Sequence, residues 1–195
     1  MNREELLKIA KPILFNTEMV RAILEGRKTV TRRLPSSRVR DKWFDYEEYV
    51  GMVAIPGSVS LREEEFYKEY PPFKKGDYLY VRETFSPVRI KTRRYLYKVG
   101  CEEANNLPIK WRPSIHMPKE AARIFLKVTD VRMERLQDIM KAPPGPHNQV
   151  VREGCTYGCD FIAVWESTIK KSDLDKYGWE ANPWVWVIEF ERVEV

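Results

Sequence analysis

The densest potential chemistry of this chain lies in one short run, Gly26-Arg27-Lys28-Thr29-Val30-Thr31-Arg32-Arg33. A threonine hydroxyl acts as a nucleophile when an adjacent base takes its proton. A lysine amine serves as that base when desolvation or neighbouring cations lower its pKa toward neutrality. The run therefore offers a nucleophile, a base and cations that would recognise an anion or an amide.

A regular strand through this run would place Lys28 and Thr31 on opposite faces, because successive side chains of a strand alternate. The two side chains converge only if the lysine lies in an irregular turn or if a bulge intervenes. The alternative interpretation is a solvated basic face. That alternative is disfavoured because the strand has polar groups on both faces. Its clustered cations also repel one another unless an anion compensates them.

The hydrophobic pattern predicts the elements that must hold this run. We expect an opening strand at Pro12–Phe15, followed by a capping pair at Asn16-Thr17. A helix then covers Glu18–Glu25 and ends at Gly26, a residue that readily adopts the left-handed conformation. The basic strand follows at Thr29–Leu34.

Farther along the chain the pattern predicts mostly strands. They are expected at Tyr78–Glu83, Tyr95–Val99, Arg123–Val131 and Trp184–Val193, with helical segments at Ala121-Ala122, Leu136–Met140 and Asp160–Lys170, an extended segment at Trp111–Pro118 and a loop at Pro143–Pro146. Strands outnumber helices and do not alternate with them regularly. We therefore expect an α+β fold built on a small mixed β-barrel or curled sheet with flanking short helices, and not a doubly wound sheet.

The length of 195 residues predicts a single domain, residues 1–195, and the composition (43% hydrophobic, 12% aromatic) excludes global disorder. Residues 35–73 are poorly patterned, and we expect a decorating insertion there with a hairpin at Met52–Ile55 and Val59–Leu61. The net charge of +5 favours an anionic partner, nucleic acid or nucleotides first. No apolar run has the length of a membrane span and the N-terminus lacks a signal-peptide pattern, so we expect a cytoplasmic protein that does not bind membranes.

The three cysteines, Cys101, Cys155 and Cys159, are too few for a disulfide framework. Together with His147, the last two would supply three zinc ligands. Their spacing departs from the common pattern, and the favoured interpretation is reduced, partly buried thiols. We therefore expect neither a metal nor another cofactor.

Other residues are candidates for the same cleft. Arg82 and Glu83 end a hydrophobic strand, where an ordinary ion pair is an equal alternative. Trp111, Arg112 and His116 would stack on and grip a base, as such side chains do with unpaired nucleotides. The alternative there is a proline-locked segment that packs its tryptophan on the barrel. A basic hairpin tip is more simply interpreted as a solvated loop; it comprises Arg89, Lys91, Arg93 and Arg94. Three tryptophans are more simply interpreted as core residues, namely Trp179, Trp184 and Trp186.

At the exit of the short helix, Gly26, Lys28, Thr31 and Arg33 form a Gly-x-Lys-x-x-Thr-x-Arg pattern that resembles the signature of the ASCH domain family. Further similar segments follow in order, namely Lys75-Gly76-Asp77 with Tyr78–Glu83, Arg123–Val131, Leu136-Gln137-Asp138-Ile139, Glu153-Gly154 and Trp165-Glu166-Ser167. Two more, Trp111–Pro118 and Trp179–Trp186, resemble a subgroup encoded by phages and prophages. The resemblance covers most of the chain apart from Pro35–Phe73. It implies a small β-barrel related to the RNA-binding PUA domain.

The resemblance also implies one concrete reaction. A branch of the family removes the acetyl group of N4-acetylcytidine with a lysine, a threonine and a glutamate, which match Lys28, Thr31 and Glu153. In that mechanism the threonine attacks the acyl carbonyl, the lysine takes its proton, and the glutamate manages water or the departing amine. Arg33 would hold a carbonyl or phosphate oxygen. Other branches resemble ribonucleases or have no assigned activity.

The sequence thus predicts a protein that binds a nucleoside, nucleotide or RNA in a cleft lined by Gly26–Arg33, with hydrolysis of an N-acylated base as its most concrete activity. The residues expected to bind substrate are Gly26, Arg33, Arg82, Glu83, Trp111, Arg112 and His116. Two alternatives stay open. One is a non-catalytic PUA-like RNA-binding module whose cations contact phosphate, and the other is an ASCH-type ribonuclease.

Overall fold

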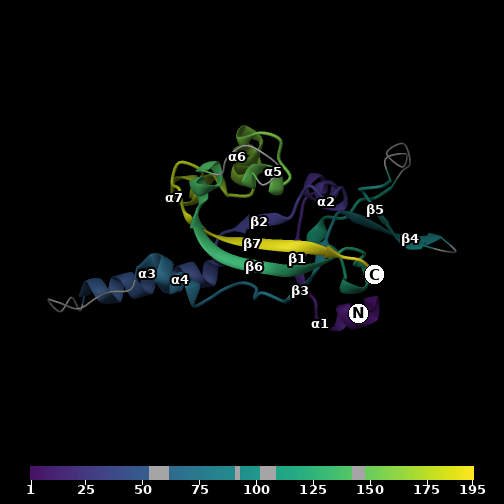
Figure 1. Cartoon of the computed structure of the whole chain (residues 1–195), viewed down its shortest axis with the longest axis horizontal. Helices are drawn as coiled ribbons and strands as arrows, with labels where there is room; N and C mark the ends of the chain where they lie inside the picture. The colour runs from purple at the N-terminus through teal and green to yellow at the C-terminus, as the bar shows by residue number, and fades with distance from the viewer. Residues whose placement is uncertain (53–61, 91–92, 102–108, 142–147) are drawn as a thin grey trace. The chain divides into compact units, whose positions relative to one another are not determined.

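Figure 1 shows the chain as a computed structural model, which describes residues 1–52, 62–90, 93–101, 109–141 and 148–195. The described residues form two compact units. The first unit comprises residues 1–29, 75–129 and 190–195, and the second comprises residues 30–74 and 130–189. Most of the expected hairpin at 52–61, the loop at Pro143–Pro146, Lys91 and His147 lie outside the described residues.

The fold is α+β, with one five-stranded mixed sheet in the order β1-β3-β6-β7-β2 and one two-stranded sheet, β4-β5. The strands are β1 (Lys11–Leu14), β2 (Val30–Arg33), β3 (Tyr78–Arg82), β4 (Phe85–Ile90), β5 (Arg93–Tyr97), β6 (Phe125–Arg135) and β7 (Trp184–Val193). Strand β1 pairs in parallel with β3, β3 pairs antiparallel with β6, and β2 pairs antiparallel with β7. Among the described strands β1 and β2 end this order without pairing to each other, so the sheet is open and does not close into a barrel.

The helices are α1 (Arg3–Ile9), α2 (Thr17–Leu24), α3 (Ser37–Met52), α4 (Glu63–Lys68), α5 (Gln149–Arg152), α6 (Gly158–Ser167) and α7 (Leu174–Tyr177). Short 3-10 turns are η2 (Ser114–His116), η3 (Lys119–Ala121), η4 (Leu136–Lys141) and η5 (Lys171–Asp173). The predictions of α2, α6, η3 and η4 are confirmed within a few residues. None of the described helices is long and apolar enough to cross a membrane.

The described parts of residues 35–73 contain two helices where the sequence pattern shows little order. Helix α3 runs for sixteen residues and α4 for six. Trp43 and Tyr46 of α3 pack on Phe66 of α4, with ring centroids 5.3 and 5.6 Å apart. The pattern hides this helix because its buried face consists of a few aromatic residues among many charged ones. That residues 1–195 form a single domain stays a prediction.

The first unit has its own core around β3 and β6. Leu79 and Val81 of β3 are fully buried, and Leu6 of α1 packs in the same cluster as Phe85 and Phe125. Helix α1 escapes sequence prediction because Leu6 is its one buried residue. An Asn2 capping box starts this helix, in which the Asn2 side chain accepts a hydrogen bond from the Glu5 N–H.

The second unit is organised around β7, for which the sequence predicts the observed bounds. Four consecutive residues, Val185–Ile188, are buried, so both faces of the strand are covered. The expected alternation is therefore incomplete, although Trp186 is a core residue as expected. The guanidinium carbon of Arg135 lies 4.3 Å from the centroid of the Trp184 ring. The Trp165 indole N–H donates to the Tyr177 carbonyl.

Candidate functional site

The end of α2 places Lys28 outside the strand. Gly26 adopts φ +75°, and its N–H donates to the Ile23 carbonyl while the Arg27 N–H donates to the Ala22 carbonyl. These two bonds form a Schellman motif, which closes the helix with a left-handed residue. The Lys28 N–H also donates to Ala22, so the lysine lies in the irregular turn before β2. This satisfies one of the two geometric conditions for the lysine to reach the face of Thr31.

The Lys28 side chain is buried and is not part of a solvated basic face. Only 3% of the residue is exposed, and its Nζ lies 5.7 Å from the centroid of the Phe15 ring. The Phe15 N–H in turn donates to the Arg82 carbonyl. Within the first unit, Phe15 therefore contacts both the lysine and the end of β3.

Thr31 lies in β2, paired with Ile188 of β7, and is also buried. Its Oγ1 accepts a hydrogen bond from Arg33 Nη1 at 2.7 Å, a contact that is possible because residues two apart in a strand share a face. Burial lowers the pKa of Arg33, and the negative charge of Glu153 opposes that shift. A guanidinium on the hydroxyl oxygen favours any negative charge that develops there.

Glu153 caps the C-terminus of α5 and is 4% exposed. Its Oε1 accepts a hydrogen bond from Arg32 Nη1 at 3.1 Å, and Arg32 Nη2 donates to Glu134 Oε2 at 3.1 Å. The Arg32 side chain is fully buried, and its Nε has no hydrogen-bond partner among the described residues. Arg32, on the face of β2 opposite Thr31, therefore holds a buried carboxylate whose charge also acts on Arg33, a residue of the Thr31 face.

Sequence reasoning does not single out Arg32 as a site residue. The available signal is its placement on the face of β2 opposite Thr31, together with the repulsion expected among neighbouring cations. The compensating anions come from Glu134 and Glu153, which lie more than 100 positions later in the chain. No local pattern connects them to the strand.

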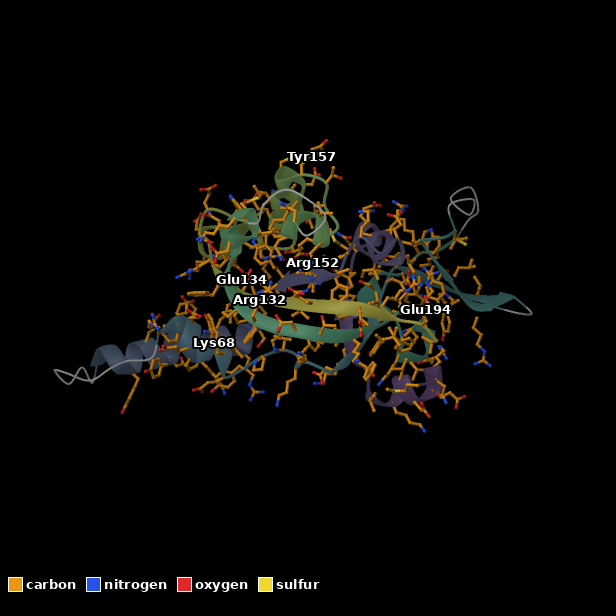
Figure 2. The ribbon with its side chains drawn as sticks, in the orientation of Figure 1. Lys68, Arg132, Glu134, Arg152, Tyr157 and Glu194 are labelled. Atoms are coloured by element: carbon orange, nitrogen blue, oxygen red, sulfur yellow. The ribbon has the colours of Figure 1, made fainter. Side chains whose placement is uncertain are left out.

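The pair between Arg32 and Glu153 belongs to a circuit of alternating charges in the second unit, in which five ion pairs join six residues and the adjacency of Arg152 and Glu153 in the chain completes the circuit. We call this circuit the charge ring; its members are Glu153, Arg32, Glu134, Arg132, Glu189 and Arg152. Glu134 Oε1 accepts from Arg132 Nε at 2.6 Å, and Arg132 Nη1 donates to Glu189 Oε1 at 2.6 Å. Glu189 Oε2 accepts from Arg152 Nη2 at 2.7 Å, and Arg152 precedes Glu153 in the chain. Figure 2 shows Arg132, Glu134 and Arg152 beside the strands of the sheet.

The charge ring shifts the pKa values of two of its members, Arg132 and Glu189. Desolvation by itself lowers the pKa of Arg132, but hydrogen bonds to Glu134, Glu189 and Asp130 outweigh it and raise that pKa. Desolvation by itself raises the pKa of Glu189, but hydrogen bonds from Arg152 and Arg132 outweigh it and lower that pKa. Both shifts favour the charged forms of Arg132 and Glu189, which strengthens the ion pairs that these two residues form in the ring.

Arg82 and Glu83, at the end of β3, do not pair with each other. Glu83 is 1% exposed, and both of its carboxylate oxygens accept from Arg123, each at 2.8 Å. Burial raises the pKa of Glu83, and the hydrogen bonds and charge of Arg123 oppose the rise. Arg82 Nη2 donates to the Ile115 carbonyl. Glu83 therefore forms an ion pair with Arg123, and an ion pair between Arg82 and Glu83 at the strand end is not what the structure shows.

The segment at Trp111–Pro118 is held against this strand end by its backbone. Phe85 and Arg112 exchange two backbone hydrogen bonds, at 3.2 and 2.7 Å, and the Glu83 N–H points at the sulfur of Met117. Arg112 and His116 are exposed, and Trp111 is half-buried. The expectation of an extended segment is corrected in part, since Ser114–His116 form a 3-10 turn.

The predicted site residues divide between the two units. The first unit holds Gly26, Lys28, Arg82, Glu83, Trp111, Arg112 and His116, and the second holds Thr31, Arg33 and Glu153. Across the parts of the chain that the structure describes, no group of three His, Cys, Asp or Glu residues is arranged to hold a metal ion. Cys155 is buried and Cys159 is exposed.

No family model, no curated protein and no solved structure matches this chain.

Proposed function

We propose that this chain is a PUA-like protein of ASCH type that binds a nucleoside, nucleotide or RNA and hydrolyses an N-acyl group on the base. The observation that supports this best is the burial of the three reactive groups. Lys28, Thr31 and Glu153 are 3%, 1% and 4% exposed. Withdrawing an amine and a carboxylate from water costs free energy. Buried groups of this kind are therefore more typical of a functional site than of a basic surface in contact with solvent.

The groups around Thr31 are suited to nucleophilic attack. In the proposed reaction Thr31 Oγ1 attacks the acyl carbon and forms an ester, while the C–N bond to the base breaks. Lys28 takes the hydroxyl proton and delivers it to the departing base nitrogen. Arg33, whose Nη1 contacts Oγ1, stabilises the negative charge of the tetrahedral intermediate.

Glu153 acts as the base in the second half of the reaction. Its carboxylate takes a proton from water, whose oxygen attacks the ester carbon; the C–O bond to Thr31 then breaks, and the proton passes from Glu153 to Thr31 Oγ1 as the acid is released. Arg32 holds one oxygen of that carboxylate, and the charge of Glu153 acts on Arg33, whose Nη1 contacts Thr31 Oγ1. Arg32 is thus a positioning residue for this step.

The test is turnover of N4-acetylcytidine by the full chain, followed as release of cytidine. We expect Thr31→Val, Lys28→Met and Glu153→Gln each to lower kcat by about 100-fold or more, the usual size of a nucleophile or acid–base contribution. Arg38→Gln is the matched control, since Arg38 is an exposed cation of α3. Circular dichroism checks that each variant is folded.

The same purified protein distinguishes the alternatives. Absence of turnover together with strongly salt-dependent RNA binding identifies a non-catalytic module. Cleavage of an RNA strand identifies a ribonuclease. Either result overturns the hydrolase proposal.

A further inference from the structure

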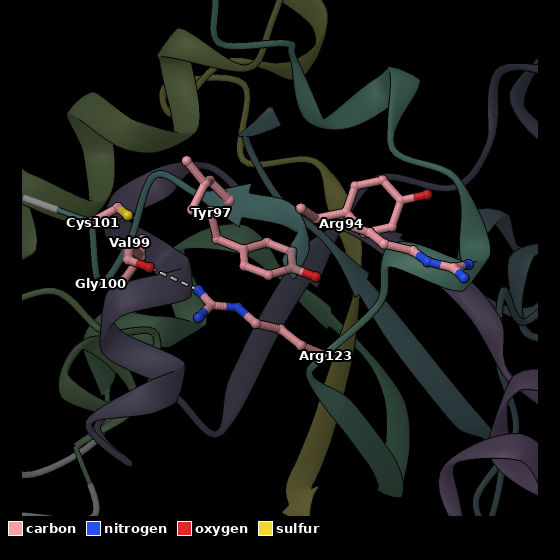
Figure 3. A pocket seen from close by; sticks show the side chains of 8 residues that line it. Arg94, Tyr97, Val99, Gly100, Cys101 and Arg123 are labelled. Atoms are coloured by element: carbon pink, nitrogen blue, oxygen red, sulfur yellow. Dashed lines mark hydrogen bonds between the residues drawn. The ribbon is translucent and has the colours of Figure 1, made fainter. Parts of the chain in front are cut away.

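A pocket of about 410 Å³ opens beside the β4-β5 sheet in the first unit. Figure 3 shows its walls, which comprise side chains of β5, the turn at Val99–Cys101, and Arg123 just before β6. This volume is within the range of small-molecule sites, roughly 300–1,000 Å³. The lining includes none of the residues of the proposed hydrolysis, so ligand binding in this pocket does not depend on that reaction.

Arg123 is fixed in orientation by three of its neighbours. Its Nε and Nη2 donate to the two oxygens of Glu83, and Nη2 also donates to the Val99 carbonyl at 2.9 Å. Its guanidinium carbon lies 4.1 Å from the centroid of the Tyr97 ring. Nη1 forms no hydrogen bond with the described residues, and the side chain is 32% exposed. The arginine therefore presents one pre-oriented donor to the pocket.

The other walls add a cation and aromatic surface. Arg94 is exposed and has no ion-pair or hydrogen-bond partner in the described chain. The Tyr97 hydroxyl is already used, since it donates to the Ala121 carbonyl at 2.6 Å, whereas its ring remains in the pocket wall. Tyr95 packs its ring on Phe85 with centroids 6.1 Å apart, and its hydroxyl has no partner among the described residues.

These groups define the ligand chemistry. Arginine only donates hydrogen bonds, so the ligand must supply acceptors. Among the described residues no acidic side chain lines the pocket, and Glu83 balances the charge of Arg123 from outside the lining, which leaves Arg94 as an uncompensated positive charge. The tyrosine rings favour a flat partner.

We propose that this pocket binds a planar ring that carries an anionic group, and that a nucleoside monophosphate is the class that fits it best. A phosphate accepts the forked donors of a guanidinium, and a base supplies a flat face for stacking. An aromatic carboxylate shares this chemistry, and the affinities for a monophosphate and for benzoate distinguish the two ligand classes.

The first test is calorimetric titration of the full chain with the four ribonucleoside monophosphates, cytidine, inorganic phosphate and benzoate. At least one monophosphate should bind at a single site. The affinity for cytidine and for inorganic phosphate should each be lower by about tenfold, the loss expected for one charge-assisted contact. Arg94→Gln should weaken the monophosphate by about tenfold as well. Arg38→Gln, which removes an exposed arginine of the second unit, should leave the affinity unchanged. Unchanged affinity in Arg94→Gln, or equal affinity for phosphate alone or benzoate, overturns the proposal.

The second test locates the ligand through the cysteines of the chain. Cys101 lines the pocket, and exposed Cys159 belongs to the other unit and serves as an internal reference. A saturating monophosphate should slow alkylation of Cys101 several-fold, measured by peptide mass spectrometry, and leave the rate at Cys159 unchanged. Equal rates at Cys101 with and without ligand would place binding elsewhere and refute the assignment. Protection of Cys101 should persist in Thr31→Val, because the pocket contains none of the residues of the proposed hydrolysis. This result therefore holds whether or not the hydrolase proposal is correct.

Discussion

The Nη1 atom of Arg32 lies 3.1 Å from Oε1 of Glu153, a residue 121 positions later in the chain. Both side chains are buried, so strand β2 and the end of α5 are joined by an ion pair that water does not reach. A buried carboxylate is stabilised by the donors it contacts, and Arg32 therefore determines where the oxygens of Glu153 lie. Arg32, which follows Thr31 in the chain, thus contacts the Glu153 carboxylate, whereas Arg33 contacts the Thr31 hydroxyl.

Removing Arg32 should destabilise the protein strongly. Arg32→Met leaves Glu153 buried without its arginine partner, and loss of one member of a buried pair costs about 3–5 kcal/mol. Glu153→Gln in the same chain should recover part of that loss, because one of the two carboxylates that Arg32 pairs with is then neutral. A double-mutant cycle by urea unfolding measures the coupling. Additive free energies would show that the two side chains do not interact.

Glu189 should make the protein less stable in acid. Its pKa is lowered in the folded state, so its contribution is present above the ordinary carboxyl value of 4.5 and is lost as the pH falls through the folded pKa. The free energy of unfolding of the wild type, relative to Glu189→Gln, should therefore decrease as the pH is lowered from 6 toward 3, by the linkage relation. Urea unfolding at several pH values checks this. A difference that does not change with pH would contradict the charge ring.

Glu83 should show the opposite dependence. Its pKa is raised by burial, so its contribution to stability is complete below the ordinary value of 4.5 and is lost as the pH rises through the folded pKa. Relative to Glu83→Gln, the wild type should become less stable as the pH rises above that ordinary value. The same unfolding series provides the measurement. A difference that grows with pH would mean that Arg123 outweighs burial.

Gly26→Ala should cost about 1 kcal/mol through backbone strain alone. Gly26 has a φ of +75°, and a Cβ built there meets no atom within 4 Å, so no steric clash adds to the strain. Thermal unfolding would register the loss. A loss of several kcal/mol would show that the glycine has a packing role that the structure does not assign to it. Asn is a matched second variant, since it tolerates the left-handed region better than Ala.

The sequence predicts those elements whose cause is local. The end of α2 follows from Gly26, and β7 follows from a run of apolar residues that matches its observed bounds. Helix α3 is not predicted, because its packing face consists of scattered aromatic residues that need α4 as a partner. Most of the candidate site is likewise non-local. The partners of Arg32 and Glu83 lie 121 and 40 residues away, and no periodicity links residues at such separations.

The most direct test of the proposed hydrolysis is to trap its intermediate. Glu153→Gln should still form the ester on Thr31 but should hydrolyse it slowly, because the base for water is missing. After incubation with N4-acetylcytidine, mass spectrometry of the peptide that contains Thr31 should show one acetyl group, absent in Thr31→Val with Glu153→Gln. Release of cytidine by the wild type without an acetylated Thr31 peptide in this variant would contradict the threonine as nucleophile.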